Sequence, residues 1–350
     1  MPLKILLLSH TFYPKIGGIE GNSELLAEAF SDEGHQVRLL TWPLDVTGRV
    51  FPYAVVRNPG IRKLIREYSW ADVVFENNPC LRLSWPNLFF ARPSVIALNT
   101  WIARPDGSVG IQDKLKKIWL KRANKVISVS SAIQMRCWPK GTVIGNPYRA
   151  DRFRRIPTIS RNCDFIFLGR LVSDKGADQT IHALYHLLKI AQAEKQDVKS
   201  LSLTIVGDGP ERENLRRLVT GLNLEKHVHF TGSLQGEELV ICLNRHRFLL
   251  VPSLWEEPFG NVVLEAMACG CVPIVSDGGG LPEAVGDAGL TFARGNVNAL
   301  VKCIQGVYND PAKKLQLLNA AKTHLVKHDP ALVSKRYLEV IEDAVKYSRS

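Results

Sequence analysis

Short apolar runs alternate with amphipathic stretches along the first part of the chain. Residues 4–9 form an apolar run typical of a buried strand, residues 23–33 show helical spacing, and residues 34–41 predict the next strand after a glycine turn. Further strands are predicted at 73–76, 94–98 and 125–129. Apolar strands that alternate with helices are typical of a doubly wound parallel sheet.

The same alternation restarts in the second half. Strands are predicted at 163–169, 201–207, 227–232, 248–252 and 272–276. A basic, polar segment separates the two series, and the last helical pattern, 332–347, has no strand after it. We therefore expect an α/β protein with two Rossmann-like, doubly wound parallel-sheet domains that face a deep cleft. The expected boundaries are 1–150 for the first domain, 151–162 for the linker, 163–328 for the second domain and 329–350 for the final helix.

Positive charge is concentrated in the first domain. Residues 1–149 contain 20 Lys and Arg against 11 Asp and Glu, a net charge of +9, whereas the rest contains 25 against 23, a net charge of +2. An anionic substrate, an anionic membrane surface or nucleic acid would each suit a basic half. Because the sequence has no zinc finger, helix-turn-helix or aromatic-interleaved basic motif, we expect no nucleic-acid partner.

The cysteines and the apolar runs bear on where the protein works. The seven cysteines are odd in number and include no C-x-x-C pair, which argues against a disulfide framework and a zinc knuckle. No apolar run is long enough to span a bilayer, and the run at 4–9 is too short for a signal peptide. We expect a cytoplasmic protein with reduced, mostly buried cysteines.

The most informative motif places two carboxylates on either side of a predicted helix start. Pro258 and Gly260 interrupt the backbone, and the apolar positions after Asn261 predict a largely buried helix. Glu257 is then expected in the entering loop, and Glu265 about one turn inside the helix. The free N–H groups between them suit a diphosphate, and the carboxylates can accept hydrogen bonds from sugar hydroxyls. Taken alone, the motif fits a solvated loop and an ordinary first-turn glutamate equally well.

Glycine-flanked loops at other predicted strand ends carry further candidates. Arg170 and Lys175 share one loop and can reach the same anion, although two solvated surface cations would look alike. Gly17 and Gly18 allow a close backbone approach or a positive φ, and a plain structural turn fits as well. Gly232 ends another strand, where backbone can read a nucleobase edge. The first loop is not a G-x-G-x-x-G motif, which argues against a dehydrogenase.

One absent motif is equally informative. The chain contains no Asp-x-Asp, the usual carboxylate pair for a metal that bridges a nucleotide diphosphate. Arg170, Lys175 and the helix N-terminus would then replace the ion electrostatically. We therefore expect a site that needs neither a metal nor a cofactor.

In their order and spacing, these motifs resemble the retaining glycosyltransferases of family four, which have the two-domain GT-B fold. The match covers nearly the whole chain and is densest at 165–290. It rests on Gly17-Gly18, Gly169-Arg170 with Lys175-Gly176, Val206-Gly207-Asp208-Gly209-Pro210, Pro252-Ser253, Glu257-Pro258-Phe259-Gly260 with Glu265, Ala268-Cys269-Gly270-Cys271-Val272-Pro273 and Gly279-Gly280-Leu281-Pro282-Glu283.

The resemblance implies roles for the matched positions. Arg170 and Lys175 would bind the donor diphosphate and stabilise the leaving group, and Glu257 would contact the transferred sugar, which makes these three the expected catalytic residues. Glu265 would bind the ribose diol. The other expected donor-binding residues are Gly17, Gly18, Gly232, Phe259, Gly260, Asn261 and Val262.

The resemblance also implies how the domains and the reaction are organised. The first domain would bind the acceptor and close over the donor, and the final helix would cross back to that domain. The acceptor would attack from the front face with retention, and the departing phosphate would take the acceptor proton. No dedicated protein base is then required.

One position departs from the family pattern. Many relatives carry a His in the loop after a strand of the first domain, and the counterpart here is Asn99. Asn99 can still donate and accept hydrogen bonds, so catalysis is not excluded. We expect Asn99 to contact the donor sugar or the acceptor, with a geometry that differs from the family's.

The segment 113–125 is basic and amphipathic. Lys114, Lys117, Lys121 and Lys125 fall on one helical face, and Leu115, Ile118, Trp119 and Arg122 fall on another. The segment suits weak peripheral contact with the inner face of an anionic membrane. Enzymes of the resembling family that have lipid-linked acceptors lie on membranes in this way. A solvated helix that packs its apolar residues into the domain is at least as good an interpretation.

The sequence therefore predicts a metal-independent, retaining hexosyltransferase. It would move a sugar, with glucose as a guess, from a nucleotide diphosphate sugar to a saccharide or lipid-linked acceptor in polysaccharide or glycolipid synthesis. UDP is the first choice of nucleotide, with GDP-mannose behind. The alternatives are a nucleotide-sugar 2-epimerase of similar fold and a catalytically silent sugar-nucleotide-binding subunit. The pairs Arg170/Lys175 and Glu257/Glu265 favour transfer over epimerisation.

Overall fold

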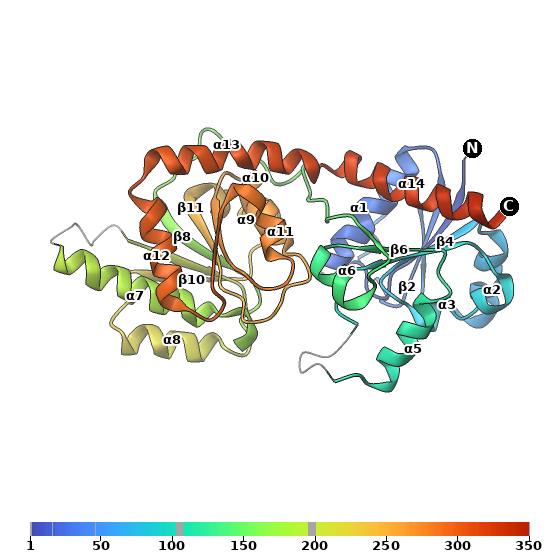
Figure 1. The fold of residues 1–350 in the computed structure, drawn as a ribbon, viewed down its shortest axis with the longest axis horizontal. Helices are drawn as coiled ribbons and strands as arrows, with labels where there is room; N and C mark the ends of the chain where they lie inside the picture. Colours follow the sequence, from blue (N-terminus) through green and yellow to red (C-terminus); the bar gives the residue numbers. More distant parts are fainter. Residues whose placement is uncertain (1, 16, 46, 103–107, 195–200, 350) are drawn as a thin grey trace. The chain divides into compact units, whose positions relative to one another are not determined.

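A computed structural model describes residues 2–15, 17–45, 47–102, 108–194 and 201–349, and in it the chain forms two compact units (Figure 1). Unit 1 contains Met1–Pro147 and His328–Ser350, and unit 2 contains Tyr148–Lys327. The final helix thus belongs to the unit in which the chain begins.

Unit 1 is built on a seven-stranded parallel sheet in the order β3-β2-β1-β4-β5-β6-β7. Its strands are β1 (Lys4–Leu8), β2 (Gln36–Thr41), β3 (Ala54–Arg57), β4 (Val73–Asn77), β5 (Ser94–Leu98), β6 (Lys125–Ser128) and β7 (Thr142–Val143). Its helices are α1 (Gly18–Asp32), α2 (Ile61–Trp70), α3 (Leu81–Ser84), α4 (Asn87–Phe90), α5 (Ile111–Leu120), α6 (Ser131–Cys137) and α14 (Pro330–Arg349).

Helices cover both faces of this sheet, which explains why β1 is a continuous apolar run. Ile5 and Leu7 share a core with residues of α1 and α14, which run side by side (Figure 1). Leu6 and Leu8 share a second core with residues of α2 and α3 on the opposite face. Successive residues of a strand point to opposite faces, so a strand with two covered faces needs no polar alternation.

Unit 2 is built on a six-stranded parallel sheet in the order β10-β9-β8-β11-β12-β13. Its strands are β8 (Cys163–Leu168), β9 (Leu203–Val206), β10 (Val228–Gly232), β11 (His246–Val251), β12 (Val272–Ser276) and β13 (Leu290–Phe292). Its helices are η1 (Ser173–Lys175), α7 (Ala177–Ala193), α8 (Arg212–Gly221), α9 (Gly236–Arg245), α10 (Asn261–Ala268), α11 (Leu281–Val285), η3 (Gly286–Ala288), α12 (Val297–Tyr308) and α13 (Pro311–Lys327).

The second sheet is also sandwiched between helices. Phe165 and Phe167 of β8 share one core with residues of α7, α8 and α12. The helices α9 and α10 contact β11, and α10 and α11 contact β12. The prediction of two doubly wound parallel-sheet domains is confirmed.

The strand order of each sheet reverses at one point. In unit 1 the chain builds outward from β1 to β2 and β3, and then returns to place β4 on the other side of β1. In unit 2 the same reversal separates β8 from β11. Ligands of such sheets bind at the carboxyl ends of the strands beside this switch point, so the loops after β1, β4, β8 and β11 are the ones that matter for function.

The strands that the sequence did not predict are β3, β7 and β13, and all three are edge strands. Edge strands are short and incompletely covered, so they lack the apolar run that marks a central strand. Helix α1 begins at Gly18, five residues before the predicted start at Ser23. The Ser23 hydroxyl does not cap the helix but donates to the carbonyl of Ile19 within it, at 2.9 Å.

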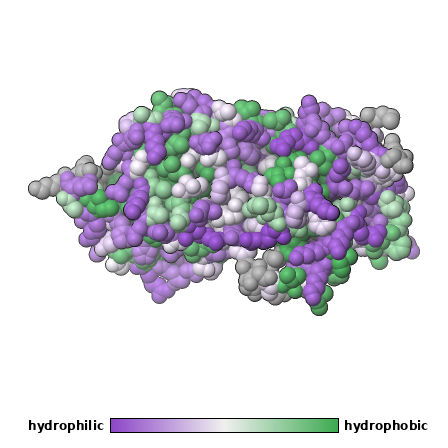
Figure 2. Space-filling view, viewed as in Figure 1, coloured by the Kyte–Doolittle hydropathy of each residue, from purple (hydrophilic) through white to green (hydrophobic). Residues whose placement is uncertain are grey.

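Helix α5 differs from its prediction in length and packing. It ends at Leu120, and Lys125 already belongs to β6, so the predicted face of four lysines is shorter than expected. Leu115 is 49% exposed and Ile118 is 57% exposed. Their packing into the domain, one of the two interpretations above, is therefore wrong, because only Trp119 of the three is held, by a hydrogen bond to Glu76 of 2.7 Å. Figure 2 shows hydrophobic and hydrophilic atoms side by side where α5 lies.

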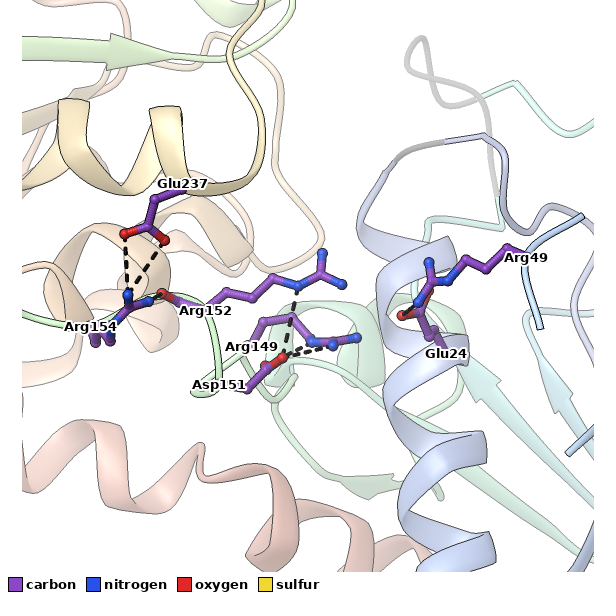
Figure 3. Close-up of polar contacts among 7 residues, drawn as sticks. All are labelled: Glu24, Arg49, Arg149, Asp151, Arg152, Arg154 and Glu237. Atoms are coloured by element: carbon purple, nitrogen blue, oxygen red, sulfur yellow. Dashed lines mark hydrogen bonds and ion pairs between the residues drawn. The ribbon is translucent and has the colours of Figure 1, made fainter. Parts of the chain in front are cut away.

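The segment 151–162 is bound to unit 2 along much of its length. Arg154 forms an ion pair with Glu237 of α9 at 3.2 Å (Figure 3). The main-chain N–H of Ile156 donates to Asn244 at 2.8 Å. Arg161 donates to the main-chain carbonyls of His246 and Cys269. None of the helices in the described ranges combines the length and apolar character that a membrane span requires.

Candidate functional site

The candidate residues of unit 2 come from two loops that flank the switch point. Arg170 lies two residues after the end of β8, and Lys175 ends the short helix η1 in the same loop. Glu257 lies in the loop after β11, and Glu265 lies in α10, one turn from its start. Because β8 and β11 are neighbours in the sheet, residues 82 positions apart in sequence meet at one edge.

Lys175 and Glu257 form an ion pair. The Lys175 ammonium donates to Glu257 Oε1, and the Ser253 hydroxyl donates to the same oxygen at 2.7 Å. The Lys175 side chain is 22% exposed and that of Glu257 is 14% exposed, so both are half-buried yet reachable. In the described part of the chain, Glu257 Oε2 has no hydrogen-bond partner. One oxygen thus fixes the carboxylate while the other is available.

Main-chain bonds tie the two loops together. The carbonyl of Asp174 accepts from the N–H groups of Leu254 and Trp255, at 2.8 and 3.0 Å. Ser253 is almost completely buried, and its own carbonyl accepts from the hydroxyl of Ser276 at 2.8 Å. The turn that carries Lys175 is therefore anchored to the segment that leads into Glu257. Such support holds a side chain in one position before any ligand arrives.

The glycine loop after β12 supports the backbone of Glu257. Gly280 donates its N–H to the Glu257 carbonyl at 2.7 Å. Gly279 has a φ of +63°, and a Cβ there would lie 2.2 Å from the same carbonyl oxygen. The backbone that this glycine loop closely approaches is therefore the Glu257 segment.

The start of α10 supplies main-chain donors beside these side chains. Gly260 precedes the helix with a φ of +114°, and a Cβ there would meet the Leu281 side chain at 2.6 Å. Phe259 is buried, whereas Asn261 and Val262, the first helical residues, are half-buried. The N–H groups of a first helical turn lack partners within the helix and favour an anion.

Two charged candidates have no partner among the described residues. Arg170 is exposed and forms no ion pair there. Glu265 is half-buried, its carboxyl forms no hydrogen bond there, and burial raises the pKa of that carboxyl to about 7. An unpaired cation would suit the phosphates of an anionic ligand, and a carboxyl that lacks donors would suit its hydroxyl groups.

The glycine candidates occupy different places. Gly232 ends β10 with a φ of +74°. Gly17 and Gly18 belong to unit 1, where Gly17 precedes α1 and Gly18 is its first residue. The φ of Gly17 is 177°, which is extended backbone, so the positive-φ interpretation is wrong for this residue, and the close-approach and structural-turn interpretations are left. Their contacts with a donor stay predictions.

Asn99 lies in unit 1 within a buried network of amides. It follows β5, its Nδ2 donates to Asn77 Oδ1 at 2.6 Å, and its Oδ1 accepts from Asn22 Nδ2 at 3.2 Å. Asn22 also reaches Asn146 at 3.4 Å, and Asn77 donates to the Ser23 hydroxyl at 2.6 Å. Asn99 is only 7% exposed. Its contact with a sugar or an acceptor stays a prediction, and the network is what holds its amide in place.

Sequence reasoning gave Ser253 no role. The serine is four residues before Glu257 in a loop, where no periodicity predicts which side chains meet. Asn22, Asn77 and Asn146, the partners of Asn99 in the network, were missed for the same reason, since they come from three separate segments of unit 1. Polar residues inside otherwise apolar strand ends are the signal that marks them.

The fold and this site define a GT-B glycosyltransferase, and a comparison with family models places the chain. The model described as "Glycosyl transferases group 1" matches residues 150–324, half of the chain. The chain belongs to this family, which confirms the resemblance found in the sequence.

Individual relatives are more distant. A glycogen synthase of Mycobacterium tuberculosis is 28% identical over 238 residues, 66% of this chain and 52% of that enzyme, so the chain spans about half of its length. The gpi3 subunit of phosphatidylinositol N-acetylglucosaminyltransferase from Schizosaccharomyces pombe is 26% identical over 345 residues, 87% of this chain and 72% of the subunit. Among solved structures, Anabaena Alr3699/HepE in complex with UDP and glucose has a TM-score of 0.81 at 21% identity, over 97% of this chain and 100% of that one. This likeness shows the fold.

Proposed function

We propose that this glycosyltransferase is a retaining hexosyltransferase that transfers glucose from UDP-glucose to a saccharide or lipid-linked acceptor, in the cytoplasmic synthesis of a polysaccharide or glycolipid. The observation that carries the proposal is the Lys175–Glu257 ion pair at the switch point, beside the unpaired Arg170 and the start of α10. The choice of UDP and glucose is supported by the HepE complex, which contains both.

Each group has a part in the proposed donor complex. An ammonium group has three N–H bonds, so Lys175 can hold Glu257 with one and diphosphate oxygens with the others. Arg170 and the first N–H groups of α10 add positive potential at the same place. The available Oε2 of Glu257 would accept from a hydroxyl of the transferred sugar, and Glu265 would accept from the ribose hydroxyls.

The proposed reaction exchanges one bond at the sugar carbon C1 for another. The bond between C1 and the diphosphate oxygen breaks, and a bond between C1 and the acceptor oxygen forms on the same face. The acceptor proton passes to the departing diphosphate oxygen. Negative charge that develops on the leaving group is stabilised by Lys175, Arg170 and the α10 N-terminus, and these fixed positive groups are why we propose that no metal ion is needed.

A nucleotide panel followed by a turnover assay tests this proposal. Calorimetric titration of the full chain with UDP, GDP and ADP should show the tightest binding for UDP. UDP release from UDP-glucose should then require an added acceptor. Donor binding without release with any acceptor would indicate a silent subunit, and conversion of the donor without an acceptor would indicate an epimerase. Unchanged kinetics in Lys175→Ala, Glu257→Ala and Glu265→Ala would overturn the assigned site.

We also propose weak peripheral contact with an anionic membrane through α5. Ile111, Leu115 and Ile118 are spaced for one helical face, and they are 78%, 49% and 57% exposed. Lys114 and Lys117 of the same helix are exposed beside them. Exposed apolar residues flanked by lysines suit an interface in which apolar groups enter the lipid and cations face anionic headgroups. A lipid-linked acceptor would lie at such an interface.

A further inference from the structure

The switch point of unit 1 carries a second group of functional side chains. His10 lies two residues beyond the end of β1, and Arg82 lies on α3, shortly after β4. The strands β1 and β4 are neighbours, and the strand order reverses between them. The position corresponds to the one that holds Lys175 and Glu257 in unit 2, and it is where sheets of this kind bind ligands.

Three cations act electrostatically on His10. Partial burial lowers the pKa of His10, and the positive charges of Arg82, Lys15 and Lys116 lower it further. These residues come from three separate segments, namely the loop after β1, helix α3 and helix α5. The fold therefore gathers four nitrogen-bearing side chains at a single place on the strand-end edge.

Two of these cations are positioned by neighbouring groups. The Arg82 guanidinium carbon lies 4.7 Å from the centre of the Trp42 ring, which follows β2. Lys116 is three residues before Trp119 and so lies on the same helical face. Trp119 Nε1 donates to Glu76 Oε1 at the end of β4, at 2.7 Å, which turns that face toward the switch point. These contacts hold the cations near one another against their mutual repulsion.

No carboxylate in the described part of the chain forms an ion pair with the cations of this cluster. Within the described ranges, Lys15, Arg82 and Lys116 form no ion pair. Glu76 is already occupied, because Oε1 accepts from Trp119 and Oε2 accepts from the N–H of Cys80 at 2.9 Å.

Two arginines elsewhere in unit 1 are paired. Arg38 contacts Glu67 and Arg49 contacts Glu24, both at 2.7 Å, and Figure 3 shows the second pair. Like charges that are gathered at a ligand edge without a counter-ion require an anion to make the arrangement favourable.

We propose that His10, Lys15, Arg82 and Lys116 form a subsite for a phosphate group carried by the acceptor. The inference rests on the proposed transfer reaction, since it names the chemistry of the molecule that receives the sugar. A phosphate offers several oxygens to ammonium, guanidinium and imidazole donors, and the Trp42 ring adds a flat apolar surface beside it. The phosphate anchors the acceptor, and the hydroxyl that reacts is elsewhere on the same molecule.

Calorimetric titration in excess UDP tests the subsite, because UDP fills the diphosphate site of unit 2. We expect glucose 1-phosphate to bind the full chain and glucose to bind at least tenfold more weakly. The double variant Arg82→Gln/Lys116→Gln should weaken glucose 1-phosphate binding at least tenfold. The matched control is Arg62→Gln/Arg66→Gln, which removes the same charge from exposed positions of α2 and should bind as the unmodified protein does.

Vesicles distinguish the source of the phosphate. If glucose 1-phosphate does not bind but the double variant loses at least tenfold in affinity for phosphatidylglycerol vesicles relative to the control, the phosphate belongs to a lipid headgroup. If neither probe separates the double variant from the control, the subsite is overturned. A failure of UDP itself to bind would contradict the proposed function instead, and the comparison between the two double variants would still be readable without UDP.

Discussion

Lys175 donates a hydrogen bond to Glu257 Oε1 across the switch point of unit 2. The pair joins the cation expected to bind the diphosphate to the carboxylate expected to bind the sugar. An unpaired carboxylate at this place would repel the donor phosphates, and an unpaired lysine would be free to adopt many conformations. The ion pair therefore holds both side chains in position for the donor. A substitution of either residue should also change the position of the other side chain.

Replacement of Lys175 tests the leaving-group role. Lys175→Gln should lower kcat by about 100-fold, because one preorganised donor to developing negative charge is typically worth that much. Steady-state kinetics with UDP-glucose measures the effect. Lys226→Gln, which removes an exposed lysine of the same unit, should leave kcat unchanged. A loss of less than twofold in Lys175→Gln would contradict the role.

Replacement of Glu257 separates the sugar from the nucleotide. Glu257→Gln should lower kcat more than it lowers the affinity for UDP, because UDP lacks the sugar that the carboxylate is expected to contact. UDP affinity should stay level or rise, since a negative charge near the diphosphate is removed. Comparison of kcat with the calorimetric Kd for UDP shows whether Glu257 contacts the sugar or the nucleotide. An equal loss in both would place Glu257 on the nucleotide.

Ser253 provides a graded version of the same test. Ser253→Ala removes one hydrogen bond to Glu257 Oε1 but keeps the Lys175 contact. We expect a decrease in kcat of about fivefold to tenfold, which corresponds to the roughly 1 kcal/mol of one ordinary hydrogen bond. Because the serine acts through Glu257, the decrease should vanish in the Glu257→Ala background, which has no acceptor for the serine hydroxyl. An undiminished effect in that background would give Ser253 a separate role.

The central strands and the edge strand β10 were predictable from the sequence, whereas the edge strands β3, β7 and β13 were not. The run at 4–9 predicts β1 because both faces of that strand are covered, so successive residues are all apolar. The residues of β3 are exposed or half-buried, and β7 has only two residues, so their sequences carry little signal. Helix α1 was placed too late because its polar residues Asn22 and Ser23 are buried in a hydrogen-bond network rather than exposed at a helix start.

The features of the site likewise fall into two groups, those that local sequence signals predict and those that depend on the fold. The sequence places Glu257 in a loop and Glu265 one turn into a helix, since Gly260 and the apolar spacing after it are local signals. The Lys175–Glu257 and Ser253–Glu257 contacts depend on which strands are neighbours and on loop conformation. Neither is encoded by spacing along the chain.

Gly279 tests whether the backbone beneath Glu257 matters. Gly279→Ala should lower both the Tm and kcat, because the residue has a φ of +63° and the new Cβ would lie 2.2 Å from the Glu257 carbonyl oxygen. We expect a loss of about 2 kcal/mol or more in the free energy of unfolding, measured by denaturant melts. The control is Gly221→Ala at the end of α8, where a Cβ meets nothing within 4 Å, and it should be neutral or slightly stabilising.

Glu265 should make stability depend on pH. Burial raises its pKa to about 7 in the folded protein, above the value of about 4.5 for an unperturbed glutamate, so the folded state holds the proton more tightly. The free energy of unfolding should therefore fall as pH rises from about 4.5 to about 7, by at most about 3 kcal/mol from this group.

Glu265→Gln removes the titration and keeps the shape. The Tm of the variant minus that of the unmodified protein should grow from pH 5 to pH 8, as measured by calorimetry. A difference that does not change with pH would contradict the raised pKa. UDP should reduce the difference at pH 8, because ribose hydroxyls would supply the donors that the ionised carboxylate lacks in the described structure.

The exposed face of α5 predicts a specific dependence on lipid charge. Leu115→Asp/Ile118→Asp should abolish flotation of the full chain with phosphatidylglycerol vesicles at low salt, because two carboxylates replace apolar groups that are 49% and 57% exposed. Phosphatidylcholine vesicles should bind neither protein, and added salt should weaken binding to phosphatidylglycerol by screening the lysines. Val326→Asp, at a 64% exposed apolar position of α13, is the control and should float as the unmodified protein does. Absence of binding by the unmodified protein would remove the membrane contact, whereas equal binding by the α5 variant would move it to another surface.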